Sequence, residues 1–164
     1  MSIGSVPAGA QLFVIDPIER LRPQKDSSVA LMEAVQRSGR SVWICTPADL
    51  CSRTGSVEAA GSVDTKDGGG SAADHRTWAW AQPLRLHPVQ ATAEGWHVPS
   101  PWYEAAEPSL VPLQHFTAVW MRKDPPVDEA YLYATLLLET AERQGVRVIN
   151  RPGALRRWNE KLGA

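Results

Sequence analysis

The fold of this chain is decided by residues 117–152, which read TAVWMRKDPPVDEAYLYATLLLETAERQGVRVINRP. The run 118–121 is apolar and rich in strand formers. A helix is predicted between Asp128, a candidate N-cap, and Gly145, a typical helix stop. A second apolar run follows at 146–149, so the order predicts a strand, a helix and a parallel strand joined by a right-handed crossover. The apolar stripe of the helix comprises Tyr131, Ala134, Leu138 and Ala141, with Leu132 and Leu136 widening it.

A polar loop joins the first of these strands to the helix. It reads RKDPP at 122–126, and because neither proline can donate a backbone hydrogen bond, the strand must end there. In α/β sheets, ligands bind at the carboxyl ends of the parallel strands. Arg122, Lys123 and Asp124 fall at such an end, and Asn150 follows the next strand. The pattern therefore predicts a functional loop rather than a plain turn.

The first part of the chain follows the same plan. An apolar run at 11–15 predicts a central parallel strand, a helix is expected from about Ser27, and a further apolar run lies at 41–45. Two strand–helix–strand units predict an α/β fold with a Rossmann-like, mostly parallel sheet and flanking helices. Asp16 and Ser27 should then lie at the same edge as the RKDPP loop, although helix capping alone would also explain the serine.

The middle of the chain, residues 48–116, has a different character. The segment 61–74, GSVDTKDGGGSAAD, has three successive glycines and almost no apolar bulk, which predicts a flexible excursion. An alternating run at 77–87 predicts an antiparallel strand, in which Pro83 indicates an edge or a break. A further short strand is expected at 96–98. An antiparallel insertion should therefore interrupt the mostly parallel sheet.

Composition excludes several classes of protein. The chain has 164 residues, a formal net charge of −1 and 43% hydrophobic residues, which allows one domain with a core and gives no field that would recruit nucleic acid or an anionic membrane. No apolar run approaches the ~20 residues of a membrane span, and residues 1–10 lack the features of a signal peptide and should be disordered. The two cysteines, Cys45 and Cys51, are farther apart than a CxxC pair, and the four histidines are scattered. These residues predict reduced thiols and no metal site, as expected for a cytoplasmic protein.

Several motifs occur together in one order along the chain. MRKDPP at 121–126 precedes a YLYAT helix, VINRP and NEKL, and IDPIERLRPQKDSSVALMEA lies near the start. These motifs closely resemble the amino-terminal part of prokaryotic glutathione synthetases, in order from about Phe13 to Leu162 and most weakly between Arg53 and Trp78. The resemblance implies a pre-ATP-grasp substrate domain at 11–152. It also implies that residues 153–164 begin the connection to an absent ATP-grasp domain.

Glutathione synthetases join γ-glutamylcysteine to glycine with ATP and magnesium. The resemblance implies these substrates and cofactors for the intact enzyme, with an ATP-grasp domain in cis or in trans making most contacts to nucleotide and metal. We expect this chain alone to bind neither cofactor and to be inactive. Arg122 would bind a substrate carboxylate bidentately and Lys123 would add a point charge. Asp124 would orient a cation or receive an amine, and Asn150 would both donate and accept hydrogen bonds.

Two alternatives stay open. The chain is either part of such an enzyme or a free-standing, non-catalytic Rossmann-like module for binding or assembly, and an ATP-grasp partner encoded beside it would favour the enzyme. Arg122 either binds substrate or merely braces its loop by pairing with Asp124 or Asp128. Under both interpretations of the chain, the surface that would dock an ATP-grasp domain is exposed, so a homo-oligomer is possible.

Overall fold

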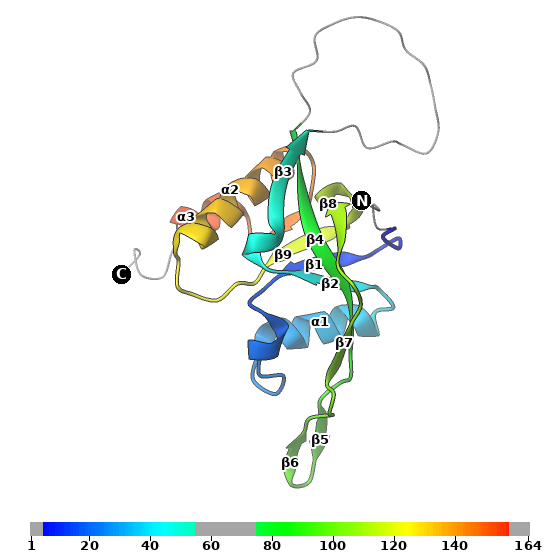
Figure 1. Ribbon diagram of the computed structural model, residues 1–164. Helices are drawn as coiled ribbons and strands as arrows, with labels where there is room; N and C mark the ends of the chain where they lie inside the picture. The colour runs from blue at the N-terminus through cyan, green and yellow to red at the C-terminus, as the bar shows by residue number, and fades with distance from the viewer. Residues whose placement is uncertain (1–4, 55–74, 158–164) are drawn as a thin grey trace, which may run out of the picture.

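The structure is a computed structural model that describes residues 5–54 and 75–157 (Figure 1). The flexible excursion expected at 61–74 lies outside the described residues, as do 1–4 and 158–164. No helix within the described ranges has both the length and the apolar character to cross a membrane.

Four parallel strands form the centre of the fold (Figure 1). They are β1 (Gln11–Val14), β2 (Val42–Cys45), β9 (Ala118–Met121) and β10 (Val148–Ile149). Their order in the sheet is β10-β9-β1-β2, and β1 pairs in parallel with both β2 and β9. The chain leaves β1 towards β2 on one side, whereas β9 and β10 lie on the other. The direction of winding therefore changes between β1 and β9, which makes this a topological switch point.

One long helix covers each face of this sheet (Figure 1). Helix α1 (Ser27–Arg37) begins after Asp26, whose carboxylate accepts the backbone N–H of Ser28 at 2.7 Å. Helix α2 (Glu129–Arg143) begins after Asp128, which accepts the N–H of Tyr131 at 2.8 Å, so both helices have side-chain N-caps. A short helix, α3 (Pro152–Arg157), packs beside α2, and three single-turn 3-10 helices lie in the connections: η1 (Ile18–Arg20), η2 (Pro47–Asp49) and η3 (Leu113–His115).

The side chains of β1, and of Ile15 directly after it, alternate between two hydrophobic cores. Leu12 and Val14 belong to the core that includes α2, whereas Phe13 and Ile15 belong to the core that includes α1. Successive side chains of a strand point to opposite faces, so a continuous apolar strand needs cover on both. This arrangement confirms the predicted α/β fold, with a mostly parallel sheet and flanking helices.

An antiparallel part extends the sheet beyond β2. Its organiser is the 12-residue strand β4 (His75–Leu86), which pairs with β2. The other strands paired with β4 are β3 (Leu50–Thr54), β7 (Tyr103–Ala105) and β8 (Ser109–Pro112). An antiparallel addition was predicted, but the edge or break indicated by Pro83 was wrong, because β4 runs through this residue with neighbours on both sides. Strand β3 pairs with β4 up to Ala79 and β8 pairs with it up to Ala81. Strand β2 pairs with β4 from Gln82 onward and β7 from Leu84 onward, so the proline lies where the neighbours change.

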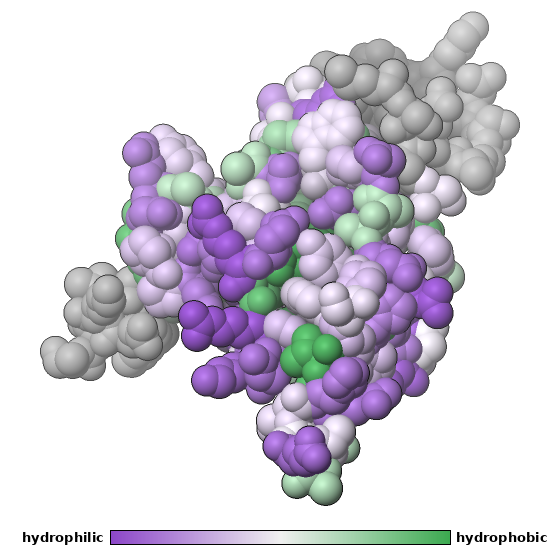
Figure 2. Space-filling model, turned by 60° about the horizontal axis from the view of Figure 1, so that its bottom comes forward, coloured by the Kyte–Doolittle hydropathy of each residue, from purple (hydrophilic) through white to green (hydrophobic). Residues whose placement is uncertain are grey.

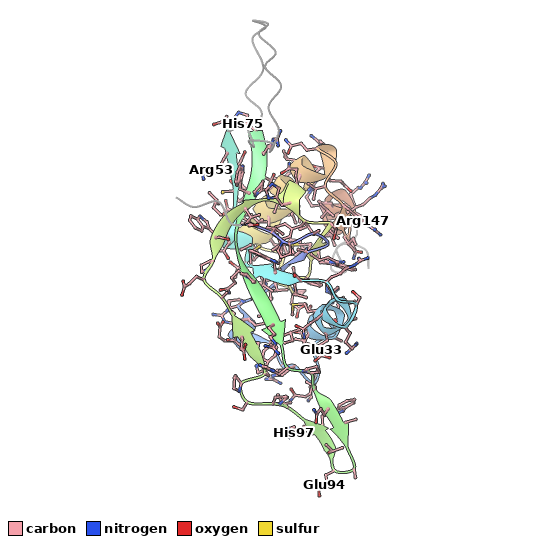
Figure 3. All side chains as sticks on the ribbon, turned by 90° about the vertical axis from the view of Figure 1, so that its right-hand side faces the viewer. Glu33, Arg53, His75, Glu94, His97 and Arg147 are labelled. Carbon is pink, nitrogen blue, oxygen red and sulfur yellow. The ribbon has the colours of Figure 1, made fainter. Side chains whose placement is uncertain are left out.

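A hairpin projects from this antiparallel part, past α1 (Figures 1 and 3). Its strands are β5 (Gln90–Thr92) and β6 (Gly95–His97), which pair with each other as a separate two-stranded sheet. Glu94 and His97 lie on this arm, away from the body of the molecule (Figure 3). Trp96 is 66% exposed, so the short strand expected at 96–98 exists but contributes little to either core.

Candidate functional site

The candidate site lies at the topological switch point, where β1 and β9 end. Val14 ends β1 and leads to Asp16, while Met121 ends β9 and leads to Arg122. The backbone N–H of Arg122 donates to the carbonyl of Val14 at 2.8 Å, so the pairing of the two strands continues one residue beyond β9. This hydrogen bond places Arg122 directly beside the end of β1.

The guanidinium of Arg122 contacts the first residues of α1. Its Nη2 donates to Ser27 Oγ at 2.6 Å, and its Nε donates to Ser28 Oγ at 3.3 Å. Ser27 is therefore not the cap of α1, a role that Asp26 fills, and its hydroxyl instead accepts the arginine. Two contacts from one planar group restrain its orientation, and they leave Nη1 without a protein partner within the described residues.

Asp16 holds the second cation of the loop. Its Oδ1 lies 3.1 Å from Lys123 Nζ, and these side chains are only 22% and 15% exposed. Its Oδ2 accepts the backbone N–H of Asp124 at 3.1 Å, and Lys123 Nζ also donates to the backbone carbonyl of Asp124. Asp16 thus ties the end of β1 to the RKDPP loop. The carboxylate of Asp124 is exposed and has no side-chain partner among the residues described.

Asn150 lies at the same edge but apart from these contacts. It follows β10, which pairs with β9 and is two strands from β1. It is exposed, and its side chain makes no hydrogen bond within the described part of the chain. The peptide bonds Ile149–Asn150 and Pro125–Pro126 are cis. Asn150 is thus the predicted site residue that the structure leaves outside the cluster, whose members are Asp16, Ser27, Arg122, Lys123 and Asp124.

Two hollows flank Asp16. One, of about 410 Å³, lies beyond the ends of β1 and β2 and is lined by Thr46, Asp49 and Trp80, among others. Cys45, at the end of β2, lines the same hollow and is a free thiol. Burial raises the pKa of Cys45 well above its ordinary value, and the Asp49 carboxylate raises it further. The thiol is therefore protonated near neutral pH and is a poor nucleophile.

The second hollow, of about 460 Å³, opens between the loop before α1 and Asp124. It carries Arg20, Arg22 and Lys25, which were not among the predicted site residues. The signal was present in the sequence, since three cations within six residues follow a strand that ends at the predicted edge. Figure 2 shows hydrophilic side chains gathered on the face of the molecule that carries α1.

Oxygen ligands for a magnesium ion are not assembled within the described ranges. No three His, Cys, Asp or Glu side chains come together there as a metal site. Asp16, the best-placed carboxylate of the cluster, already binds Lys123 and a backbone N–H.

The chain is similar to known proteins over nearly its whole length. It is 47% identical over 154 residues to the glutathione synthetase of Parasynechococcus marenigrum (strain WH8102) and 48% identical over 154 residues to that of Prochlorococcus marinus (strain MIT 9313). It is 43% identical over 152 residues to the glutathione synthetase of Thermosynechococcus vestitus (strain NIES-2133 / IAM M-273 / BP-1). These alignments cover 94%, 94% and 93% of this chain but only 39%, 39% and 42% of the relatives.

The chain thus spans about two fifths of the length of the curated relatives that it matches. Residues 10–156 match the family model described as "Prokaryotic glutathione synthetase, N-terminal domain". This match includes both strand–helix–strand units and every residue of the cluster at the switch point. The chain therefore belongs to the family of prokaryotic glutathione synthetase N-terminal domains.

Proposed function

We propose that this chain is the amino-terminal, substrate-binding part of a glutathione synthase, which ligates γ-glutamylcysteine and glycine in an ATP-dependent reaction. The family of the chain and the names of its relatives support the reaction. One observation supports the role within it most strongly: the guanidinium of Arg122 is held at the switch point by Ser27 and Ser28, with Lys123 beside it. The substrate domain would comprise residues 11–152.

The chemistry of these groups suits a substrate with carboxylates. A guanidinium can bind a carboxylate through two parallel hydrogen bonds, and in Arg122 Nη1 and the second N–H of Nη2 remain for this purpose. Because the two serine hydroxyls already restrain the side chain, less of its freedom is lost when the substrate binds. Lys123 adds positive charge that Asp16 partly neutralises, and the free carboxylate of Asp124 suits an amine. Asn150, farther along the edge, would donate and accept hydrogen bonds.

ATP and Mg²⁺ are the cofactors that we propose for the intact enzyme, bound mainly by an ATP-grasp domain in cis or in trans. ATP would supply the phosphoryl group that activates the cysteinyl carboxylate for attack by the glycine amine. The residues of this chain would bind and orient the dipeptide. A cytoplasmic location is consistent with two cysteines that are both free.

Three measurements test the proposal. The isolated chain, given γ-glutamylcysteine, glycine, ATP and Mg²⁺, should make no glutathione above a blank without protein. Joined to the remaining part of the Parasynechococcus marenigrum relative, it should turn over. In that chimera Arg122→Lys should lower kcat/KM about ten- to a hundredfold, because a charge-assisted hydrogen bond is worth ~1.5–3 kcal/mol.

Arg40→Lys is the matched control, since Arg40 is an exposed arginine just before β2, at the opposite edge of the sheet. It should leave kcat/KM unchanged. Normal efficiency of Arg122→Lys combined with a lowered melting temperature would show that Arg122 only braces its loop. Turnover by the isolated chain would contradict the dependence on an ATP-grasp domain.

A further inference from the structure

The loop that lines the second hollow has a defined backbone. Ile18 in η1 is 3% exposed and anchors the loop in the core that includes α1. The N–H of Arg20 donates to the carbonyl of Pro17 at 2.9 Å. The carbonyl of Arg22 accepts the N–H groups of both Lys25 and Asp26 at 2.9 Å, which leads directly into the N-cap of α1. The three cations therefore project from a hydrogen-bonded frame.

The cations of this hollow lack ion-pair partners in the part of the chain that the structure describes. Arg20, Arg22 and Lys25 make no ion pair within the described ranges. Of the acids that line the same hollow, Asp16 binds Lys123, and Asp26 caps α1 through one carboxylate oxygen but keeps its negative charge. Asp124 is the remaining acid of the lining, and its carboxylate has no side-chain partner among the described residues. The hollow thus offers unpaired cations together with one unpaired carboxylate.

A ligand that carries a carboxylate and an ammonium group on the same carbon would satisfy both kinds of charge. We propose that the hollow between Arg20, Arg22, Lys25 and Asp124 binds the zwitterionic amino-acid head of the glutamyl residue, an inference that rests on the proposed function. The α-carboxylate lies against the arginines and the lysine, and the α-ammonium lies against Asp124. Charge-assisted hydrogen bonds of this kind are the strong ones in proteins.

The position of the hollow favours γ-glutamylcysteine over glycine as the ligand. Asp16 belongs to both the hollow and the cluster around Lys123, so the two sites adjoin. The dipeptide has a second carboxylate, on its cysteinyl residue, which can reach the Arg122 and Lys123 side while the glutamyl head fills the hollow. Glycine has one carboxylate and would leave one of the two cationic sites empty.

The test is a set of titrations of the ¹⁵N-labelled chain followed by ¹H–¹⁵N NMR, which measures weak binding and reports whether each variant is folded. The ligands are γ-glutamylcysteine, N-glutarylcysteine, which lacks the α-amine, γ-aminobutyrylcysteine, which lacks the α-carboxylate, and glycine alone. The variants are the double variant Arg20→Gln/Arg22→Gln and the single variant Asp124→Asn. Arg40→Gln is the matched control at the opposite edge of the sheet.

The double variant should raise the Kd of γ-glutamylcysteine about tenfold or more and leave that of γ-aminobutyrylcysteine within about twofold. Asp124→Asn should raise the Kd of γ-glutamylcysteine similarly and leave that of N-glutarylcysteine unchanged. If the dipeptide binds the wild-type chain but the variants do not change its Kd, or weaken all ligands equally, the assignment is wrong while the proposed function stands. Displacement of the dipeptide from the hollow by glycine alone would also overturn it. Absence of any dipeptide binding to the wild-type chain would contradict both proposals.

Discussion

The contact between Arg122 and Ser27 should contribute measurably to the free energy of unfolding. The perturbation is a double-mutant cycle of Arg122→Lys, Ser27→Ala and the variant with both changes. A hydrogen bond to a charged group is worth ~1.5–3 kcal/mol, but Ser27 is exposed, so water replaces part of that energy. We therefore expect a coupling of about 1 kcal/mol between the two positions. Each single variant should melt about 2–4 °C lower for every kcal/mol that it loses.

The assay is urea unfolding of the four proteins, with the free energy of unfolding extrapolated to water. A second cycle provides the control, with Ser27→Ala and Arg37→Lys, because Arg37 lies at the far end of α1 and pairs with Glu33 instead. Those two changes should be additive within about 0.5 kcal/mol. If the Arg122 and Ser27 changes are equally additive, the hydroxyl does not hold the guanidinium, and the restraint that we assign to Arg122 does not exist.

Two further predictions concern the body of the fold. Leu138→Ala should lower the free energy of unfolding by about 2–5 kcal/mol in urea titrations, because Leu138 lies on the fully buried face of α2. Leu136→Ala on the same helix should cost well under 1 kcal/mol, since Leu136 is 49% exposed. Equal losses in the two variants would contradict the orientation of α2. Iodoacetamide at pH 8 should alkylate Cys51 before Cys45 in peptide mass maps, because the Cys45 thiol is buried and its pKa is raised well above the ordinary 9.0. Because the pKa of Cys45 is raised in the folded state, its thiol ionises first in the unfolded chain, so its contribution to stability is complete below pH 9 and falls as the pH rises further. Cys45→Ala should therefore reduce the slope of the free energy of unfolding against pH above pH 9. An unchanged slope would argue against the raised pKa.

The parallel half of the fold could be predicted because its signals are local. Proline and glycine bound the apolar runs, and Asp128 and Gly145 sit where the helix between them begins and ends. The width of the buried stripe could not be predicted so well. Leu132 and Leu136 were expected to widen it, and this was wrong, because they are 42% and 49% exposed. Helix α2 touches the sheet along one narrow line, so residues one position away from that line turn about 100° out of the contact.

Short strands of the antiparallel half could not be predicted from their sequences. Strand β7 has three residues, YEA, of which two are exposed, and β3 has five residues, LCSRT, of which one is buried. Neither strand has an apolar pattern of its own. Each forms by pairing with β4, which its own sequence does not indicate. Pro83 was misleading for a related reason. A missing N–H marks an edge only when one strand is paired along its whole length, and β4 changes partners at that point.

The sheet topology predicted which residues lie near one another at the candidate site, but not which side chains contact each other. Parallel strands end at one edge, and the helix after the first strand begins there, so Asp16, Ser27 and Arg122 had to lie near one another. Which side chains form hydrogen bonds with Arg122 depends on side-chain lengths and conformations, which the topology does not specify. Arg122 was given Asp124 or Asp128 as bracing partners, yet Asp128 caps α2 and the arginine reaches the serines of α1 instead. Because neutral hydroxyls rather than a carboxylate hold the guanidinium, its positive charge is not cancelled, and the cluster keeps a cation available for an anionic ligand.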